Sequence, residues 1–251
     1  MARLLALLPL LFPEPATLAY RFPKGLVYEE TTERRFVFEQ KVEGESRRMA
    51  RSSVETLRRT VLEADATQHP TMERVEVLRF TTTVEESPAE ETGTTADDVQ
   101  GKTFVWRRLA DRWGLFDGKR EVTAHHPRLV DRLVNWRDAR LPKAPVAPGA
   151  TWEVTAQTYL ETAGQPVPPG IEGVAVFRLE RVEGGVAHVA FAFRGRARVG
   201  GEMQSWEQEG AWTFDVDKGR DLEASTKGTV EVEGAAGGAG EFTMTRKVAY
   251  P

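Results

Sequence analysis

Two adjacent histidines are the first residues whose types and spacing could support chemistry. His125 and His126 lie near Glu121 and Asp131 in the sequence, and such side chains can ligate a metal or transfer protons. Adjacent residues on a short turn seldom present both rings to one metal, and the other two histidines are remote in sequence. A capping or surface role is therefore the better interpretation, and we expect no metal site.

Other motifs of catalysis and ligand binding are incomplete. Gly101-Lys102-Thr103 would end a phosphate-binding loop if residue 96 were glycine, but it is Ala96, and the residues that follow have the pattern of a strand instead of a helix. The acidic residues from Asp215 to Glu223 are interrupted by Lys218 and Arg220, which would repel calcium, so we interpret them as surface charges of a hairpin turn.

No common hydrolase motif is present, and the chain contains no cysteine for thiol chemistry. We therefore expect no cofactor and favour a protein that is not an enzyme. A hydrolase remains open as an alternative, because 38 acidic residues are present and only folding would show which of them converge.

Tryptophan supplies the candidate ligand-binding residues. The ordinary role of such residues is in the core of a β-protein. The sharper hypothesis is that they partly line a concave apolar surface, because a strongly curved sheet around one helix can leave a cavity. The candidates are Trp106, Trp113, Trp136, Trp152, Trp206 and Trp212.

The N-terminus has the pattern of an export signal. One arginine precedes a short apolar run, and a small-residue cleavage site ends at Ala19. We predict a signal peptide over residues 1–19 and a single β-rich domain over residues 20–251, with a possible internal division at the proline-rich connector 141–149. No later segment approaches the length of about 20 apolar residues that spans a membrane, so we expect a mature chain that does not span one.

Short alternating runs predict that the domain is mostly β. Residues 34–42 alternate as a strand with one wet face, whereas 52–66 fits both a helix and a strand, and we favour the strand. Residues 85–100 are acidic and turn-rich, which predicts a solvated loop. One convincing helix is expected over residues 127–138. The predicted fold is a large curved antiparallel sheet, half-barrel-like, packed on this main helix.

The order of segments resembles a group of exported proteins. Lys24-Gly25-x-x-Tyr28, the strand start at 101–104, the Pro-Val-Ala-Pro-Gly-Ala-Thr-Trp run at 145–152 and the hairpin 210–219 resemble uncharacterised exported β-rich proteins of high-GC bacteria. The same order is loosely similar to the periplasmic lipoprotein-carrier half-barrel, in which a curved sheet encloses an apolar ligand. The resemblance implies a fold and no particular activity.

These observations favour an exported binding protein, periplasmic or secreted, that is soluble. Its net charge of −4 argues against a nucleic-acid partner, whose phosphates attract basic proteins. We expect it to carry an apolar small molecule or lipid, or to engage an envelope protein. The first alternative is a structural or interaction module without a ligand, which would use the acidic segment 85–100 and the sheet edges.

Overall fold

The protein is an antiparallel β-structure. The computed structural model describes residues 14–42, 45–87, 92–96, 99–109, 113–122, 137–162, 167–234 and 237–251. The strands are β1 (Val27–Val42), β2 (Glu45–Ala64), β3 (Pro70–Ser87), β4 (Thr92–Ala96), β5 (Thr103–Arg108), β6 (Trp113–Asp117), β7 (Arg120–Glu121), β8 (Thr151–Thr155), β9 (Glu172–Glu183), β10 (Val186–Val199), β11 (Glu202–Asp215), β12 (Arg220–Glu233) and β13 (Gly238–Ala249). The helical segments are α2 (Ala156–Thr162) and the 3₁₀ turn η2 (Arg137–Arg140).

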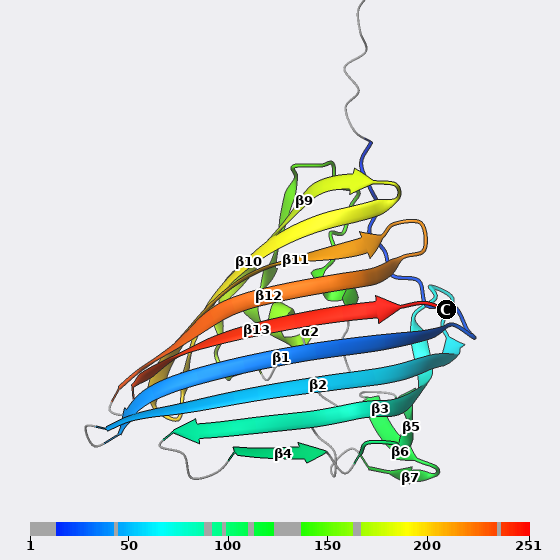
Figure 1. Cartoon of the computed structure of the whole chain (residues 1–251). Helices are drawn as coiled ribbons and strands as arrows, with labels where there is room; N and C mark the ends of the chain where they lie inside the picture. The colour runs from blue at the N-terminus through cyan, green and yellow to red at the C-terminus, as the bar shows by residue number, and fades with distance from the viewer. Residues whose placement is uncertain are drawn as a thin grey trace, which may run out of the picture.

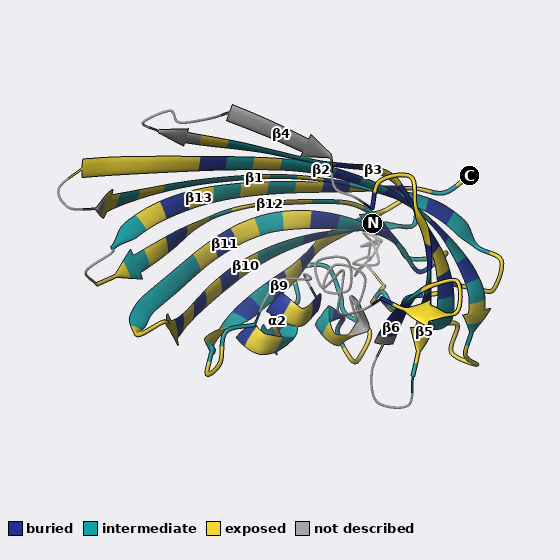
Figure 2. Cartoon of the chain, turned by 90° about the horizontal axis from the view of Figure 1, so that it is seen from below, coloured by how far each residue is buried: buried dark blue, intermediate teal, exposed yellow. Residues whose placement is uncertain are grey.

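All thirteen strands belong to one sheet. Its order is β7-β6-β5-β3-β2-β1-β13-β12-β11-β10-β9-β8, with β4 beside β3 (Figure 1). The first long strand therefore pairs with the last one at the centre of the sheet, from Glu29 opposite Ala249 to Gln40 opposite Gly238. The long strands arch over α2, so the sheet has a concave inner face and a convex outer face (Figure 2). The predicted mostly-β, curved antiparallel fold is confirmed.

The helix predicted over residues 127–138 lies mostly outside the described residues, and its last two residues begin η2. A helix that we did not predict, α2, begins directly after β8. The Thr155 hydroxyl caps it by accepting a hydrogen bond from the backbone N–H of Thr158 at 3.2 Å. It buries Ala156, Tyr159 and Leu160 on one face.

Two further predictions concern the first half of the chain. Residues 52–66 fall mostly in β2, so the preference for a strand there is confirmed. The helical spacing was misleading, because every second residue, from Glu55 to Val61, is buried and the pattern is that of a strand. The prediction of a loop over 85–100 is wrong in part. β3 continues to Ser87, and β4 pairs with residues 81–85 of β3.

The outer face of the sheet is polar and carries ion pairs between neighbouring strands. Arg58 binds Glu29 at 2.8 Å and Glu76 at 3.4 Å, so three strands are linked through one guanidinium. Lys227 binds Glu209 at 2.7 Å in the same manner. Exposed ion pairs of this kind contribute little to stability, and they mark this face as the one exposed to solvent.

Glycine allows the sheet to bend on its inner face. Gly228 lies opposite Phe242 on the neighbouring strand. A Cβ atom at Gly228 would come within 2.3 Å of the Glu207 carbonyl oxygen and 2.7 Å of the Phe242 ring. Gly210 is crowded in the same way by Ser225 and Phe191. Close approach of backbone and ring at these glycines accommodates the curvature of the sheet.

Two apolar cores lie under the sheet. The larger one gathers residues of β9, β10, β11, α2 and the segment before β1, including Leu18, Tyr20 and Phe22. The smaller one lies under β2, β3, β5 and β6 and contains Phe104 and Trp106. Leu18 is only 4% exposed, although it precedes the predicted cleavage point, which stays a prediction. Among the described residues no helix is long and apolar enough to cross a membrane.

Candidate functional site

A cluster of charged side chains lies on the concave face between the two cores. Strand alternation places Glu30, Thr32 and Arg34 of β1 on this face, because residues two apart point the same way. The cluster extends across the neighbouring strands, because Thr32 is opposite Glu55 of β2 and opposite Arg246 of β13. Most of these side chains are buried, although charged groups are usually excluded from interiors.

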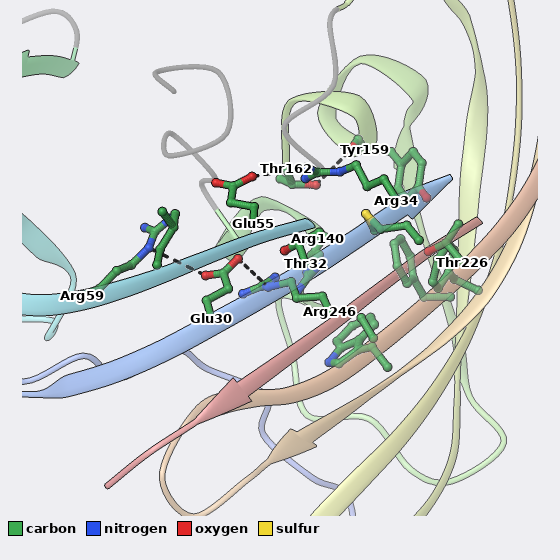
Figure 3. Close-up of a pocket in the computed structure, with 16 residues that line it drawn as sticks. Glu30, Thr32, Arg34, Glu55, Arg59, Arg140, Tyr159, Thr162, Thr226 and Arg246 are labelled. Atoms are coloured by element: carbon green, nitrogen blue, oxygen red, sulfur yellow. Dashed lines mark hydrogen bonds and ion pairs between the residues drawn. The ribbon is translucent and has the colours of Figure 1, made fainter. Parts of the chain in front are cut away.

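Glu30 is the bridge of the cluster. One of its oxygens lies 2.8 Å from Nε of Arg246, and the other lies 3.7 Å from Nε of Arg59 (Figure 3). Arg59 also forms an ion pair with Glu73 of β3 at 3.4 Å, and the Tyr28 hydroxyl donates a hydrogen bond to Glu73 at 3.0 Å. Four strands are therefore connected by a single chain of charges.

Asp221 anchors the other end of the same cluster. Its carboxylate lies 3.3 Å from Nη1 of Arg246 and 2.7 Å from Nη2 of Arg140. The Tyr20 hydroxyl donates to Asp221 at 2.7 Å and accepts from Arg140 at 2.6 Å. The Tyr250 hydroxyl donates to the Asp221 carbonyl oxygen at 2.9 Å. Our interpretation of Asp221 as a surface charge is wrong, because the residue is 3% exposed.

A small cavity opens beside this cluster. Its volume is about 50 Å³. Its charged lining consists of four arginines (Arg34, Arg59, Arg140 and Arg246) and two glutamates (Glu30 and Glu55). Glu73 and Asp221 pair with arginines of this lining from outside it, so the cluster as a whole is balanced, while more guanidiniums than carboxylates line the cavity itself.

Arg34 is the most accessible of the arginines with a described ion pair in this cluster. Its side chain is 31% exposed and lies 3.4 Å from the buried carboxylate of Glu55. The side chains of Arg59, Arg140 and Arg246 are 13% exposed or less.

Aromatic residues also line the cavity. Phe177, Phe191, Trp212 and Tyr159 line it. The guanidinium of Arg140 lies 4.8 Å from the centre of the Trp212 ring, which joins the charged wall to the aromatic one. The Tyr159 hydroxyl donates to Gln208 at 2.8 Å, and burial raises the pKa of Tyr159 above its ordinary value.

Trp212 has a buried donor of its own. The residue is 2% exposed, and its indole N–H has no hydrogen-bond acceptor among the described residues. An indole N–H can only donate, and buried donors in proteins are normally satisfied.

An aromatic surface extends from the cavity along the concave face. Phe36 and Phe38 follow Arg34 at alternate positions of β1, and their rings lie 6.0 Å apart. Phe36 is opposite Phe242 of β13, so this ring shares the same face. All three rings are half-buried.

The structure brings together two of the six tryptophans proposed from the sequence. Trp152 and Trp212 make an edge contact at 6.3 Å, and only Trp212 lines the cavity. Trp106 is buried in the smaller core, and Trp206 is half-buried on β11. Trp136 and the side chain of Trp113 lie outside the described residues. A ligand-binding role for these residues stays a prediction.

The charged part of the site was missed in the sequence. Glu30, Arg59, Asp221 and Arg246 belong to no motif, and charged residues are usually assigned to the surface. The available signal was their position, because Glu30 and Arg34 alternate with the outward residues of a strand whose inward residues continue as Phe36 and Phe38.

The carboxylates of the cluster are engaged in ion pairs. Glu30, Glu55, Glu73 and Asp221 each contact an arginine. Within the described ranges, no three histidine or acidic side chains are grouped to hold a metal ion. His125 and His126 lie outside those ranges.

Neither a known protein family nor a curated relative matches the sequence. Among solved structures, Pseudomonas aeruginosa OccK11 (OpdR) is 10% identical, with a TM-score of 0.22, over 90% of this chain and 66% of that one. Pseudomonas aeruginosa OccK1 (OpdK) is 9% identical, with a TM-score of 0.17, over 89% of this chain and 67% of that one. This chain thus spans about two thirds of their length, and similarity of this size does not establish a common fold.

Proposed function

We propose that the protein is a non-enzymatic binding protein that holds an apolar ligand, or the apolar part of an amphipathic one, on the concave face of its sheet. The observation that carries this proposal is the half-buried aromatic surface of Phe36, Phe38 and Phe242, which adjoins the cavity. Large apolar side chains that remain partly accessible on a concave face commonly mark ligand sites.

The dimensions of the site support a ligand that lies along the sheet. The cavity is too small to enclose a lipid chain, since ligand pockets usually measure about 300–1,000 Å³. A chain would instead lie on the aromatic surface, with one end at the cavity. The predicted export signal supports a carrier that acts in the periplasm or outside the cell.

An interaction module without a ligand is the competing proposal. It would use the segment 85–100, in which β4 borders β3, and it would leave the concave face empty. Nothing in the described part of the chain specifically favours it, and the same holds for a hydrolase.

Native mass spectrometry combined with organic extraction tests the proposal. The exported protein is purified from the periplasm of an expression host, and we expect a stoichiometric apolar adduct. The purified protein, freed of that adduct, is then titrated with dodecan-1-ol while tryptophan fluorescence is recorded. A saturable change is expected, and its absence together with a clean unliganded mass would overturn the proposal.

Neighbouring residues on opposite faces give a matched pair of variants. Phe38→Glu places a charge on the concave aromatic surface and should weaken dodecanol binding at least tenfold. Val37→Glu places the same charge on the outer face and should leave binding unchanged. Equal affinities in two variants that are equally folded by circular dichroism would move the ligand elsewhere.

A further inference from the structure

The charged side chains that line the cavity include more guanidinium groups than carboxylates. Four guanidinium groups face it with two carboxylates, and arginine has no acceptor atom. The Trp212 indole adds a buried N–H that has no acceptor among the described residues. A group that brings only acceptor oxygens and negative charge would complement such a wall, because charge-assisted hydrogen bonds to guanidinium are among the strongest in proteins.

The volume of the cavity limits what this group is. A single water needs about 10–15 Å³ measured in the same way, so about 50 Å³ holds the equivalent of three to five waters. A carboxylate, sulfate or phosphate group is of this size, whereas a sugar or a nucleotide is larger.

The position of Arg34 connects the cavity to the aromatic surface. Arg34 lines the cavity, and Phe36 and Phe38 follow it at alternate positions on the same face. From Arg34 to Phe38 the strand rises by about 13 Å at roughly 3.3 Å per residue. A ligand whose acidic end lies at Arg34 would therefore have an apolar surface beneath its chain.

We infer that the ligand is an acidic amphiphile, with its anionic head group in the cavity against Arg34 and Trp212 and its alkyl chain along Phe36 and Phe38. This inference rests on the proposed function and specifies its ligand class. Arg59, Arg140 and Arg246 also line the cavity but are engaged by buried carboxylates, so Arg34, the most accessible of the four, is the guanidinium that would meet the head group.

The test compares probes that share one chain and differ in head group. Dodecanoate and dodecan-1-ol are titrated into the full, unliganded protein below their aggregation limits, and inorganic phosphate serves as a head group without a chain. We expect dodecanoate to bind at least tenfold more tightly than dodecanol, and phosphate to bind weakly or not at all. Equal binding of both dodecyl probes would overturn the acidic head group and leave the proposed function intact. Failure of both would overturn the proposed function itself, and tight binding of phosphate alone would indicate a free-anion site instead.

Neighbouring arginines provide the control. Arg34→Gln should abolish the preference for dodecanoate, whereas Arg35→Gln, exposed on the outer face, should retain it. Arg34→Gln leaves the buried Glu55 without this partner, so Arg34→Gln/Glu55→Gln is measured beside it to keep the cluster balanced. Trp212→Phe keeps a smaller aromatic side chain and removes the donor, and it should lower dodecanoate affinity several-fold and dodecanol affinity by less. Retention of the preference in both the Arg34 single and double variants would overturn the inference.

Discussion

Asp221 is the residue on which the buried charge cluster depends most. Its carboxylate oxygens lie within 3.3 Å of the guanidinium groups of Arg140 and Arg246 and of the Tyr20 hydroxyl. Asp221→Asn removes the charge at nearly constant shape and leaves two largely buried arginines undercompensated. We expect it to lower the free energy of unfolding by about 3–5 kcal/mol, measured by urea denaturation.

The matched control for this change lies in the same strand. Glu223 forms an exposed pair with Lys247 at 3.7 Å, and Glu223→Gln should change the free energy of unfolding by about 0–1 kcal/mol. Similar losses in the two variants would mean that the cluster does not behave as a buried network.

Tyr159 should make the folded protein less stable at alkaline pH. Burial raises its pKa, with the positive charge of Arg140 acting weakly in the opposite direction. Above the ordinary tyrosine pKa of about 10, the unfolded chain loses this proton while the folded chain keeps it, so stability falls as pH rises. Tyr159→Phe should lower stability at neutral pH by about 1–3 kcal/mol, because Gln208 loses a partner, and should flatten its decline above pH 10.

Alkaline titration provides the measurement for Tyr159. The chain has four tyrosines, and the ultraviolet absorbance of tyrosinate in the folded protein should lack the contribution of Tyr159 near pH 10. Denaturant melts of the wild type and of Tyr159→Phe across the same pH range complete the comparison. Parallel pH profiles would contradict the prediction.

At the scale of single residues, apolar identity was easier to predict than buried charge. Large aromatic side chains are expected in the core of a β-protein, and Trp152 and Trp212 do pack together. Glu30 and Arg246 were not candidates, since a charged residue in an alternating strand is equally compatible with either face until its cross-strand partners are known.

Glycines set the curvature of the individual strands. At Gly228 a methyl group would collide with the Glu207 carbonyl oxygen and with the Phe242 ring. We expect Gly228→Ala to destabilise the protein by about 1–3 kcal/mol through forced displacement of backbone and ring, measured by thermal unfolding. Ser225→Ala, exposed in the same strand, should change stability by at most about 0.5 kcal/mol. Tolerance of Gly228→Ala would show that the bend does not need glycine there.

Elements were predictable where local pattern and tertiary structure agree. The turn at Gly184-Gly185 follows from residue type alone, and its glycines adopt φ values of 56° and 80°. The solvent-exposed face of β1 follows from the alternation of polar and apolar residues. α2 is too short to show a helical period, and its Thr155 cap was the available signal. β4 consists of Thr92, Gly93, Thr94, Thr95 and Ala96, and it pairs only because β3 offers an edge beside it.

At the scale of the whole molecule, the segment before β1 is part of the larger core. Leu18→Ala in the full chain should lower the free energy of unfolding by about 2–5 kcal/mol, because it removes a buried side chain, whereas Thr17→Ala at the exposed neighbouring position should have little effect. Urea denaturation of both variants checks this. Equal stability of the two would mean that Leu18 is dispensable to the folded domain.

The arrangement of the two cores could not be predicted from the sequence. Each apolar cluster follows from ordinary strand patterning, but the charged cluster between them depends on which strands become neighbours. That neighbourhood is set by the pairing of β1 with β13, which are separated by most of the chain, and local sequence contains no information about such a pairing.

The central pairing of β1 with β13 also sets the order in which the protein can be completed. Strands β1 to β7 leave the ribosome and cross any membrane well before β13, so the edge of β1 stays uncovered until β13 itself has been delivered. An uncovered edge of sixteen residues invites association with other chains. A newly made chain therefore has to be kept unfolded or shielded during transit, and a premature stop before residue 238 would leave two half-sheets that lack their shared seam.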